Sequence, residues 1–358
     1  MALLEVRDLK VSFRTDDGIV QAVDGVSYSV EAGRSLGIVG ESGSGKSASS
    51  LSVMGLTRAP NAQISGSVLF DGRDLVSAPA DALRRIRGDE IAMIFQDPLS
   101  SLHPLHKVGK QLVEAVQAHR DVPRAQALDR ALEMLDLVGI ADARRRADSY
   151  PHEFSGGMRQ RVMIAMALVN DPKVLIADEP TTALDVTVQA QILELMARLQ
   201  REREMAIVII THDLGIVAEL ADEIAVMYAG RIVEHGPTPT IFAAPEHPYT
   251  WGLLQSIPRL DSARDTELVA IPGSPPSLIN RPSGCHFHPR CAYALPEHRR
   301  VDPPLAAIAH DPRHATACLL DARTRRALWS ALRGGATPRE ARRSVGLPDE
   351  PAAHEEAT

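Results

Sequence analysis

The chain has 358 residues, a formal net charge of −7 and 44% hydrophobic residues. This length allows a sizeable core in two domains, or in one large domain with an appendage, and the apolar fraction excludes a wholly disordered chain. No apolar run approaches the roughly 20 residues of a membrane-spanning helix, so we do not expect the chain itself to cross a bilayer. The N-terminus lacks the pattern of an export signal, and the mild acidity argues against a broad nucleic-acid surface.

The first 235 residues predict one α/β unit. Short β-branched runs alternate with helical patterns, and four of these runs are typical of buried parallel strands: Ser35–Val39, Ile91–Phe95, Val174–Ala177 and Ala206–Ile210. Residues 107–147 mix polar and apolar positions at helical spacing. They therefore indicate a helical insertion within a βα unit.

The composition changes near residue 236. Prolines are frequent from there to residue 312, and the same segment and its continuation hold all three cysteines. Long helices are not expected in this segment, and a short helix is predicted at Asp321–Arg333. Residues 334–358 are rich in Gly, Pro, Glu and Ala and are expected to form a disordered tail.

A phosphate-binding loop is predicted directly after the first of the four strands. Residues 40–47, Gly-Glu-Ser-Gly-Ser-Gly-Lys-Ser, have two glycines separated by four residues and followed by Lys and Ser. Backbone N–H groups of such a loop and of the next helix converge on phosphate oxygens, and glycines permit the turn and the close approach. We expect Lys46 to pair with the β- and γ-phosphates and Ser47 to ligate Mg²⁺. The predicted nucleotide contacts are Gly40, Ser42, Gly43, Ser44, Gly45, Lys46 and Ser47.

Two acidic residues follow another predicted strand. Asp178 and Glu179 come directly after the run at 174–177. An Asp at this position can hold Mg²⁺ through Ser47 or through a water, and Glu179 is the candidate to polarise the attacking water. The alternative is a surface acidic pair that caps the following turn.

A Ser-Gly-Gly triplet, Ser155-Gly156-Gly157, precedes a helical run and lies shortly before Asp178. With the motifs in this order, residues 1–235 resemble the ATP-binding cassette family. The resemblance implies a P-loop nucleotide-binding domain with a RecA-like α/β core, an antiparallel β subdomain and a helical subdomain at about residues 98–165. In that family the Ser-Gly-Gly cap at a helix N-terminus binds the γ-phosphate of a nucleotide held by the opposite subunit, so that two cassettes enclose two ATP molecules.

The same resemblance assigns four more residues. Gln96 matches the Gln that senses Mg²⁺, Asp185 lies in the loop that crosses the dimer interface, and His212 matches the switch histidine that contacts the γ-phosphate. Phe13 is the expected adenine-stacking aromatic, and the alternative is that it belongs only to the core. The predicted catalytic residues are thus Glu179, His212 and Gln96, and the predicted Mg²⁺ ligands are Ser47, Gln96 and Asp178.

The C-terminal part resembles the extension of dipeptide and oligopeptide import ATPases. The similarity lies in residues 246–250, Glu-His-Pro-Tyr-Thr, and 272–276, Pro-Gly-Ser-Pro-Pro. That branch typically carries four cysteines in this region, and some members hold a 4Fe–4S cluster there. Cys285, Cys291 and Cys318 match, whereas His298 stands where a further cysteine is expected. Three thiolates and one imidazole can ligate an iron–sulfur cluster or Zn²⁺, and a segment without metal is the third alternative.

The resemblance as a whole implies an ATPase on the cytoplasmic face of the cell membrane that powers import of di- or oligopeptides. One phosphate loop and one Ser-Gly-Gly cap per chain require two cassettes to meet, and the branch usually pairs two different ATPases, which favours a heterodimer. Two transmembrane permease subunits and, indirectly, an extracytoplasmic peptide-binding protein are the other expected partners. The alternatives are an importer ATPase for another small solute such as nickel, and a soluble ATPase acting on nucleic acid. The single cassette, the acidic balance and the extension argue against the latter.

Overall fold

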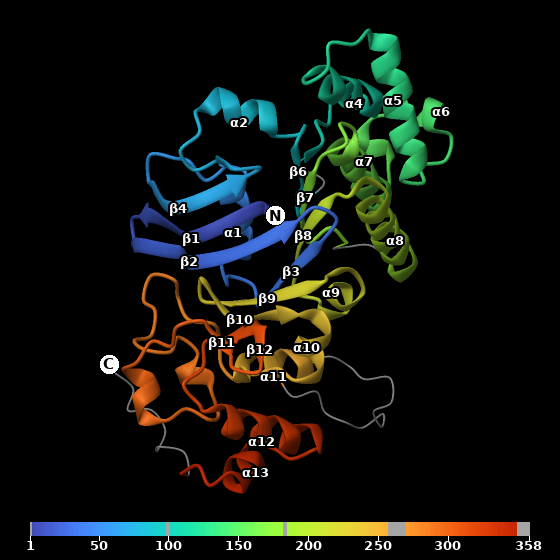
Figure 1. The fold of residues 1–358 in the computed structure, drawn as a ribbon. Helices are drawn as coiled ribbons and strands as arrows, with labels where there is room; N and C mark the ends of the chain where they lie inside the picture. Colours follow the sequence, from blue (N-terminus) through green and yellow to red (C-terminus); the bar gives the residue numbers. More distant parts are fainter. Residues whose placement is uncertain (1, 98–100, 182–184, 257–269, 349–358) are drawn as a thin grey trace.

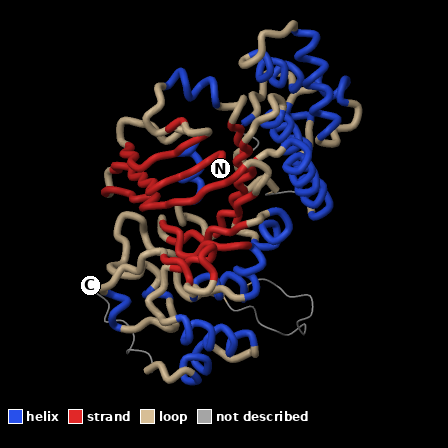
Figure 2. The backbone as a smooth tube through the Cα atoms, in the orientation of Figure 1, coloured by secondary structure: helices blue, strands red, loops and turns tan. Residues whose placement is uncertain are grey.

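The computed structural model describes residues 2–97, 101–181, 185–256 and 270–348, and its strands gather in two sheets (Figures 1 and 2). The smaller sheet has the order β2-β1-β4-β5, and the larger has the order β11-β12-β10-β9-β3-β8-β7-β6. The strands are β1 (Ala2–Thr15), β2 (Gly18–Glu31), β3 (Ser35–Val39), β4 (Ala62–Phe70), β5 (Arg73–Asp74), β6 (Ile91–Ile94), β7 (Val174–Asp178), β8 (Ala206–Thr211), β9 (Glu223–Tyr228), β10 (Arg231–Pro237), β11 (Ala306–Ile308) and β12 (Asp311–Thr316).

The middle of the larger sheet is parallel and buried on both faces. Strands β9, β3, β8, β7 and β6 run parallel, and alternate residues of each point to opposite faces. In β8, Ala206, Val208 and Ile210 pack towards the antiparallel sheet, whereas Ile207 and Ile209 pack towards the helices. Because both faces are covered, these strands are nearly continuous apolar runs. The four strands predicted from such runs are confirmed as β3, β6, β7 and β8.

Helices α7, α8 and α9 cover one face of the core sheet, and α4, α5 and α6 form a lobe beside it (Figure 1, green). The lobe packs α4 and α5 on each other and on α7, as the helical pattern at 107–147 predicts. None of the described helices is long and apolar enough to pass through a membrane. The helices are α1 (Lys46–Val53), α2 (Ala80–Ile86), α4 (Val108–Gln117), α5 (Arg124–Leu137), α6 (Ala143–Ala147), α7 (Gly156–Leu168), α8 (Val186–Arg203), α9 (Leu214–Leu220), α10 (Thr238–Ala243), α11 (Pro248–Gln255), α12 (Ala322–Arg333) and α13 (Pro338–Ser344), with short 3₁₀ turns η1 (Pro151–Glu153), η2 (His288–Arg290) and η3 (Pro296–Arg299).

The C-terminal extension continues the core sheet. Strand β10 crosses residue 236, where the composition changes, and β12 pairs with it antiparallel. A buried polar network holds this junction: Glu234 accepts hydrogen bonds from His314 Nε2 at 2.7 Å and from the N–H of Glu246 at 2.5 Å, and Arg325 Nε donates to Glu246 at 2.6 Å. Since buried charges are tolerated only when paired, this network fixes the extension against the α/β core.

The prediction of a disordered tail is wrong for residues 334–348. Helix α13 begins there with a capping box in which Thr337 and Glu340 bond each other's backbone N–H groups, and Pro338 occupies its first turn. Ala341 is fully buried in a small core with Trp251 and Trp329, and Arg342 donates to the carbonyl of Ala292 at 2.5 Å. Gly, Pro and Glu, which suggested disorder by composition, serve here as helix-end residues. The remainder of the predicted tail, 349–358, lies outside the described residues, and the predicted helix at 321–333 is confirmed as α12.

Candidate nucleotide site

The loop between β3 and α1 has the backbone that the phosphate motif requires. Gly45 has a φ of 100°, and a Cβ atom added there would lie 2.2 Å from the carbonyl oxygen of Ala22. At Gly40 an added Cβ would lie 2.1 Å from the carbonyl oxygen of Met227. No side chain fits at either position, so the loop can turn tightly only with glycine. Ser42 and Gly43 are exposed at the tip of the loop, and Ser44 is buried.

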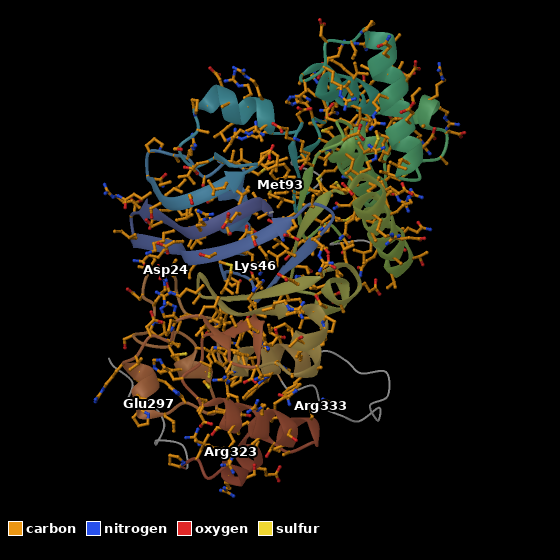
Figure 3. The ribbon with its side chains drawn as sticks, in the orientation of Figure 1. Asp24, Lys46, Met93, Glu297, Arg323 and Arg333 are labelled. Carbon is orange, nitrogen blue, oxygen red and sulfur yellow. The ribbon has the colours of Figure 1, made fainter. Side chains whose placement is uncertain are left out.

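Lys46 is buried at the first position of α1 (Figure 3). Its Nζ donates to the carbonyl oxygens of Gly40 at 2.7 Å and Glu41 at 2.9 Å. Burial lowers the pKa of Lys46, and the nearby carboxylates of Glu179 and Asp178 oppose that shift. The ammonium group is thus held inside the loop and beside the two predicted acidic residues.

Asp178 and Ser47 offer oxygen ligands that suit Mg²⁺. The side chain of Asp178 lies near Ser47, and its Oδ1 atom is buried without a hydrogen-bond partner. Burial raises the pKa of Asp178. A buried carboxylate oxygen that lacks a partner is costly, and a divalent cation beside it would satisfy it. The donor set therefore fits the predicted magnesium ion.

The three predicted catalytic residues meet at the end of β7. Gln96 Nε2 donates to Glu179 Oε2 at 2.9 Å, and His212 Nδ1 lies 3.1 Å from Glu179 Oε1. Glu179 has a φ of 48°, a left-handed conformation that costs about 1 kcal/mol for a residue with a side chain. Its N–H donates to the carbonyl of Ile210 in β8 at 2.8 Å, so the neighbouring strand holds this turn in place.

The Ser-Gly-Gly triplet lies at the N-terminus of α7. Ser155 caps the helix by accepting a hydrogen bond from the N–H of Met158 at 3.3 Å, and Ser155 and Gly156 are exposed. Asp185 caps α8 in the same way, accepting from the N–H of Val188 at 2.9 Å. Ala183 and Leu184, which belong to the motif predicted around Asp185, lie outside the described residues. Both helix starts thus present backbone N–H groups at the surface.

Phe13 lies in β1, opposite Val20 of β2 and Ala62 of β4. Its side chain is partly buried against the core below the antiparallel sheet. This placement is compatible with the core alternative as well as with stacking on a base. Its role as the adenine contact stays a prediction.

The three cysteines and His298 gather in the extension without forming a closed metal site. Burial raises the pKa of Cys291, with a further contribution from Cys318 and Cys285, and burial raises the pKa of Cys318 to about 12. His298 Nε2 is buried without a hydrogen-bond partner, and its backbone carbonyl accepts from Cys285. The donor chemistry suits a metal, but within the described part of the chain no three His, Cys, Asp or Glu side chains are close enough to hold one. The geometry therefore gives the iron–sulfur expectation no support.

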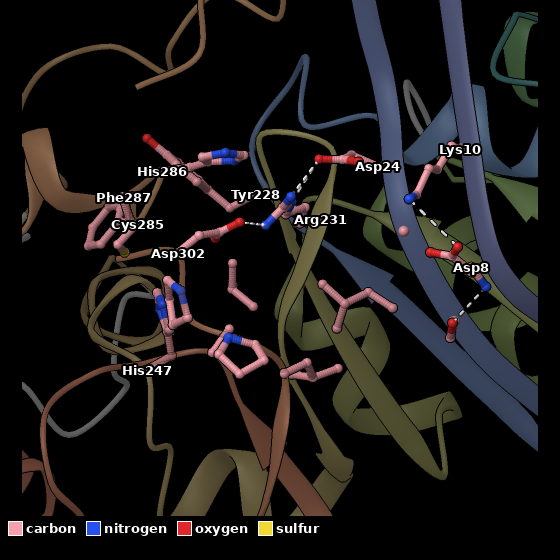
Figure 4. Close-up of a pocket in the computed structure, with 18 residues that line it drawn as sticks. Asp8, Lys10, Asp24, Tyr228, Arg231, His247, Cys285, His286, Phe287 and Asp302 are labelled. Carbon is pink, nitrogen blue, oxygen red and sulfur yellow. Dashed lines mark hydrogen bonds and ion pairs between the residues drawn. The ribbon is translucent and has the colours of Figure 1, made fainter. Parts of the chain in front are cut away.

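A pocket of about 410 Å³ opens between the antiparallel sheet and the extension (Figure 4). Arg231 of β10 pairs there with Asp24 at 2.7 Å and with Asp302, and Lys10 pairs with Asp8 at 3.6 Å. No residue of the loop at 40–47 is among the described residues that line it. The pocket is therefore distinct from the phosphate loop, and its Arg231 and Lys10 are already paired with carboxylates.

Sequence reasoning missed the contacts that the extension makes with the phosphate loop. Arg290 donates to both carboxylate oxygens of Glu41, and the N–H of Glu41 donates to the Tyr249 hydroxyl oxygen at 2.8 Å. These residues are more than 200 positions apart, as the separations of 249 and 208 show. One feature of the sequence pointed to Arg290: it immediately precedes Cys291, which matches a cysteine of the import-ATPase extension.

Two family models match separate parts of the chain. The ABC transporter model matches residues 23–182, and the model of the oligopeptide/dipeptide transporter C-terminal region matches residues 233–297. The chain is 53% identical to the oligopeptide transport ATP-binding protein OppD of Bacillus subtilis, over 86% of each chain. It is 52% identical to the protein of the same name from Salmonella typhimurium, over 88% of this chain and 93% of that one.

Solved structures resemble the nucleotide-binding part. The ATP-binding cassette MJ0796, in a dimeric post-hydrolysis state bound to ADP and Pi, has a TM-score of 0.60 and 28% identity, covering 66% of this chain and 98% of that chain. CbiO1 of Clostridium perfringens, part of an ABC transporter complex, has a TM-score of 0.56 and 31% identity, covering 68% and 91%. The phosphate loop, the Asp-Glu pair and these matches agree: the chain belongs to the ATP-binding cassette family, as an ATP-binding subunit of its oligopeptide transport branch.

Proposed function

We propose that this chain hydrolyses ATP to power the import of di- and oligopeptides through a membrane transporter. The meeting of Glu179, Gln96 and His212 beside the phosphate loop is the observation that carries the proposal. The peptide cargo is supported by the relatives, whose names describe oligopeptide transport, and by the match of the extension.

The loop would bind the phosphates of ATP, and residues at the strand ends would help to bind Mg²⁺. The backbone N–H groups of Gly40, Ser42, Gly43, Ser44 and Gly45 cradle the phosphates, and Lys46 moves its ammonium from the loop carbonyls to phosphate oxygens. Ser47, Asp178 and Gln96 would hold Mg²⁺, which supplies charge neutralisation between the phosphates when bound. Phe13 would stack on the adenine.

Glu179 is the proposed acceptor for the proton of the attacking water. The water oxygen forms a bond to the γ-phosphorus, the bond from that phosphorus to the bridging oxygen breaks, and ADP leaves. His212 and Gln96, bonded to the two oxygens of Glu179, orient the carboxylate towards the water. Positioning of this kind supplies most of the catalysis in phosphoryl transfer.

The second half of each site would come from another cassette. Ser155, Gly156 and Gly157 present the N-terminus of a 13-residue helix at the surface, where it can cap a γ-phosphate held by the opposite subunit. Asp185 lies at the same kind of exposed helix start. The solved structure of the similar cassette MJ0796 is a dimer, which supports this arrangement. We infer a heterodimer of this chain with a related ATPase.

Closure of the two cassettes would drive the transporter. ATP binding favours the closed state and hydrolysis the open one, and a ligand can shift such an equilibrium only by its difference in affinity for the two states. Two transmembrane permease subunits are expected to respond to this closure, with a peptide-binding protein acting on their outer side. With these partners, the chain would act at the cytoplasmic face of the membrane.

Reconstitution tests this function. The chain, purified with its membrane subunits and partner ATPase in proteoliposomes, is expected to hydrolyse ATP several-fold faster when the binding protein carries an oligopeptide than when it is empty. Stimulation of ATP hydrolysis by Ni²⁺ and not by peptides would overturn the proposal that the cargo is a peptide. Equal stimulation by nucleic acid without any membrane subunit would overturn the transport role.

The set of Cys285, Cys291, Cys318 and His298 remains a predicted metal site, and metal analysis of the purified complex checks this prediction. An iron–sulfur cluster predicts iron together with a broad visible absorbance band that is lost in Cys291→Ser, whereas a zinc site predicts colourless protein with one Zn²⁺ per chain. Protein purified anaerobically with neither metal above background would contradict both predictions. His106→Ala, which alters an imidazole in the helical lobe, is the matched control that should leave the metal content unchanged.

A further inference from the structure

A largely buried ion pair joins the extension to the phosphate loop. Arg290 Nη1 and Nη2 donate to the two carboxylate oxygens of Glu41 at 2.6 and 2.9 Å. The Arg290 side chain is 5% exposed and that of Glu41 is 28% exposed. A two-pronged pair of this kind fixes orientation as well as distance, because both N–H groups of the guanidinium must align with one carboxylate.

Arg290 is itself held firmly within the extension. Its Nε donates to the carbonyl of Pro272 at 2.8 Å, and its guanidinium carbon lies 5.8 Å from the ring centroid of Tyr228. It ends the 3₁₀ turn η2, directly before Cys291. The side chain therefore reaches the loop from a packed scaffold, and little further ordering is needed to hold Glu41.

Tyr249 of α11 makes a second contact with the same loop residue. The N–H of Glu41 donates to its hydroxyl oxygen at 2.8 Å, and Tyr249 is fully buried, with its ring 4.7 Å from that of Tyr228 and 5.4 Å from that of Phe287. The carbonyl of Glu41 accepts from Lys46 Nζ at 2.9 Å. The extension thus holds both the side chain and the N–H of a residue whose carbonyl contacts the phosphate-binding lysine.

The charge of Glu41 gives this contact a second consequence. A carboxylate in a loop that binds a triphosphate repels the ligand, and the repulsion is strong where the surroundings exclude water. The guanidinium of Arg290 cancels that charge. We propose that Arg290 is a positioning residue of the ATP site, with Tyr249 as its companion, so that the C-terminal extension sets the affinity of the phosphate loop for ATP. This inference rests on the proposed role of residues 40–47 as the triphosphate site.

Steady-state kinetics of the full chain in its assembled transporter test the inference. Arg290→Ala is expected to raise the KM for ATP about tenfold with less than about a twofold change in kcat, since the loop is disturbed but Glu179 is not. Arg290→Lys keeps the charge but not the two-pronged geometry and should raise KM about threefold. Adding Glu41→Gln to Arg290→Ala should return KM most of the way to the parent value, because the uncompensated carboxylate is then absent.

Arg281→Ala is the matched control. Arg281 also belongs to the extension and its side chain is 8% exposed, but it pairs with Asp24 of β2 at 2.8 Å and not with the loop. This variant should lower the melting temperature about as much as Arg290→Ala and leave KM unchanged. Equal KM in the Arg290 variants and the parent, an equal rise in the Arg281 variant, or failure of Glu41→Gln to rescue would overturn the inference. A parent chain that binds no ATP would instead overturn the assignment of the site, which the parent measurement reports separately.

Discussion

Glu179→Gln is expected to retain ATP binding and to reduce ATP turnover at least about a hundredfold, the usual effect of removing a general base. The amide keeps nearly the same size and can still bond Gln96 and His212, so the loop and the magnesium ligands stay in place. It cannot accept the proton of the attacking water. Binding measured by equilibrium titration and turnover measured by phosphate release separate the two effects.

Glu219→Gln provides the control for this change. Glu219 is an exposed residue of α9 in the same domain, and the same substitution there should alter neither binding nor turnover. Full turnover in Glu179→Gln would remove Glu179 from its proposed role. Loss of ATP binding in that variant would show that the carboxylate serves the ligand and not the water.

Lys46→Ala is expected to weaken ATP binding by about ten- to a hundredfold. A hydrogen bond to a charged group contributes about 1.5–3 kcal/mol, and each 1.4 kcal/mol corresponds to a factor of ten in affinity. Lys46 is 6% exposed and already lies inside the loop, so its ammonium group needs little ordering to reach phosphate oxygens. Titration of the full chain with a fluorescent ATP analogue and Mg²⁺ measures the change.

Lys107→Ala is the corresponding control, since Lys107 is an exposed lysine of the helical lobe that pairs with Asp148 at 3.0 Å. It should bind the nucleotide as the parent does. Unchanged affinity in Lys46→Ala would contradict the phosphate site as the structure presents it. A fall of equal size in both variants would indicate a general effect of charge on the anionic ligand.

The residues predicted for the ATP site carry local sequence signals, and the structure brings Gln96, Glu179 and His212 together, while their catalytic roles stay predictions. The phosphate loop needs glycines at two fixed positions, and the structure explains why: the carbonyl oxygens of Ala22 and Met227 leave no room for a side chain at Gly45 and Gly40. The strand runs before the loop and before Asp178 are apolar on both faces because they are buried on both faces. Gln96, Glu179 and His212 lie at the ends of parallel strands or just beyond them, and such ends meet at one edge of a sheet.

The extension was predicted less well because its order comes from distant partners. Its prolines excluded long helices correctly, but composition said nothing of β12 pairing with β10, or of Glu234 accepting from His314. The tail was misjudged because a capping box and one buried alanine outweighed an overall polar composition. The contacts of β12 and Glu234 join residues about eighty positions apart, whereas the capping box joins Thr337 and Glu340, three positions apart, and is a local signal that overall composition does not reveal.

Sequence alone thus predicted the family, which the comparisons confirm, and the phosphate loop and the acidic pair, since each prediction depends on residue types at short, fixed spacings. Tertiary structure alone decided that Arg290 and Tyr249 contact Glu41, that His298 Nε2 is buried without a partner, and that the extension shares the core sheet. The physical reason is that each of these arrangements depends on segments that only the folding of the whole chain brings together. No local pattern of residues encodes which surface a side chain will meet.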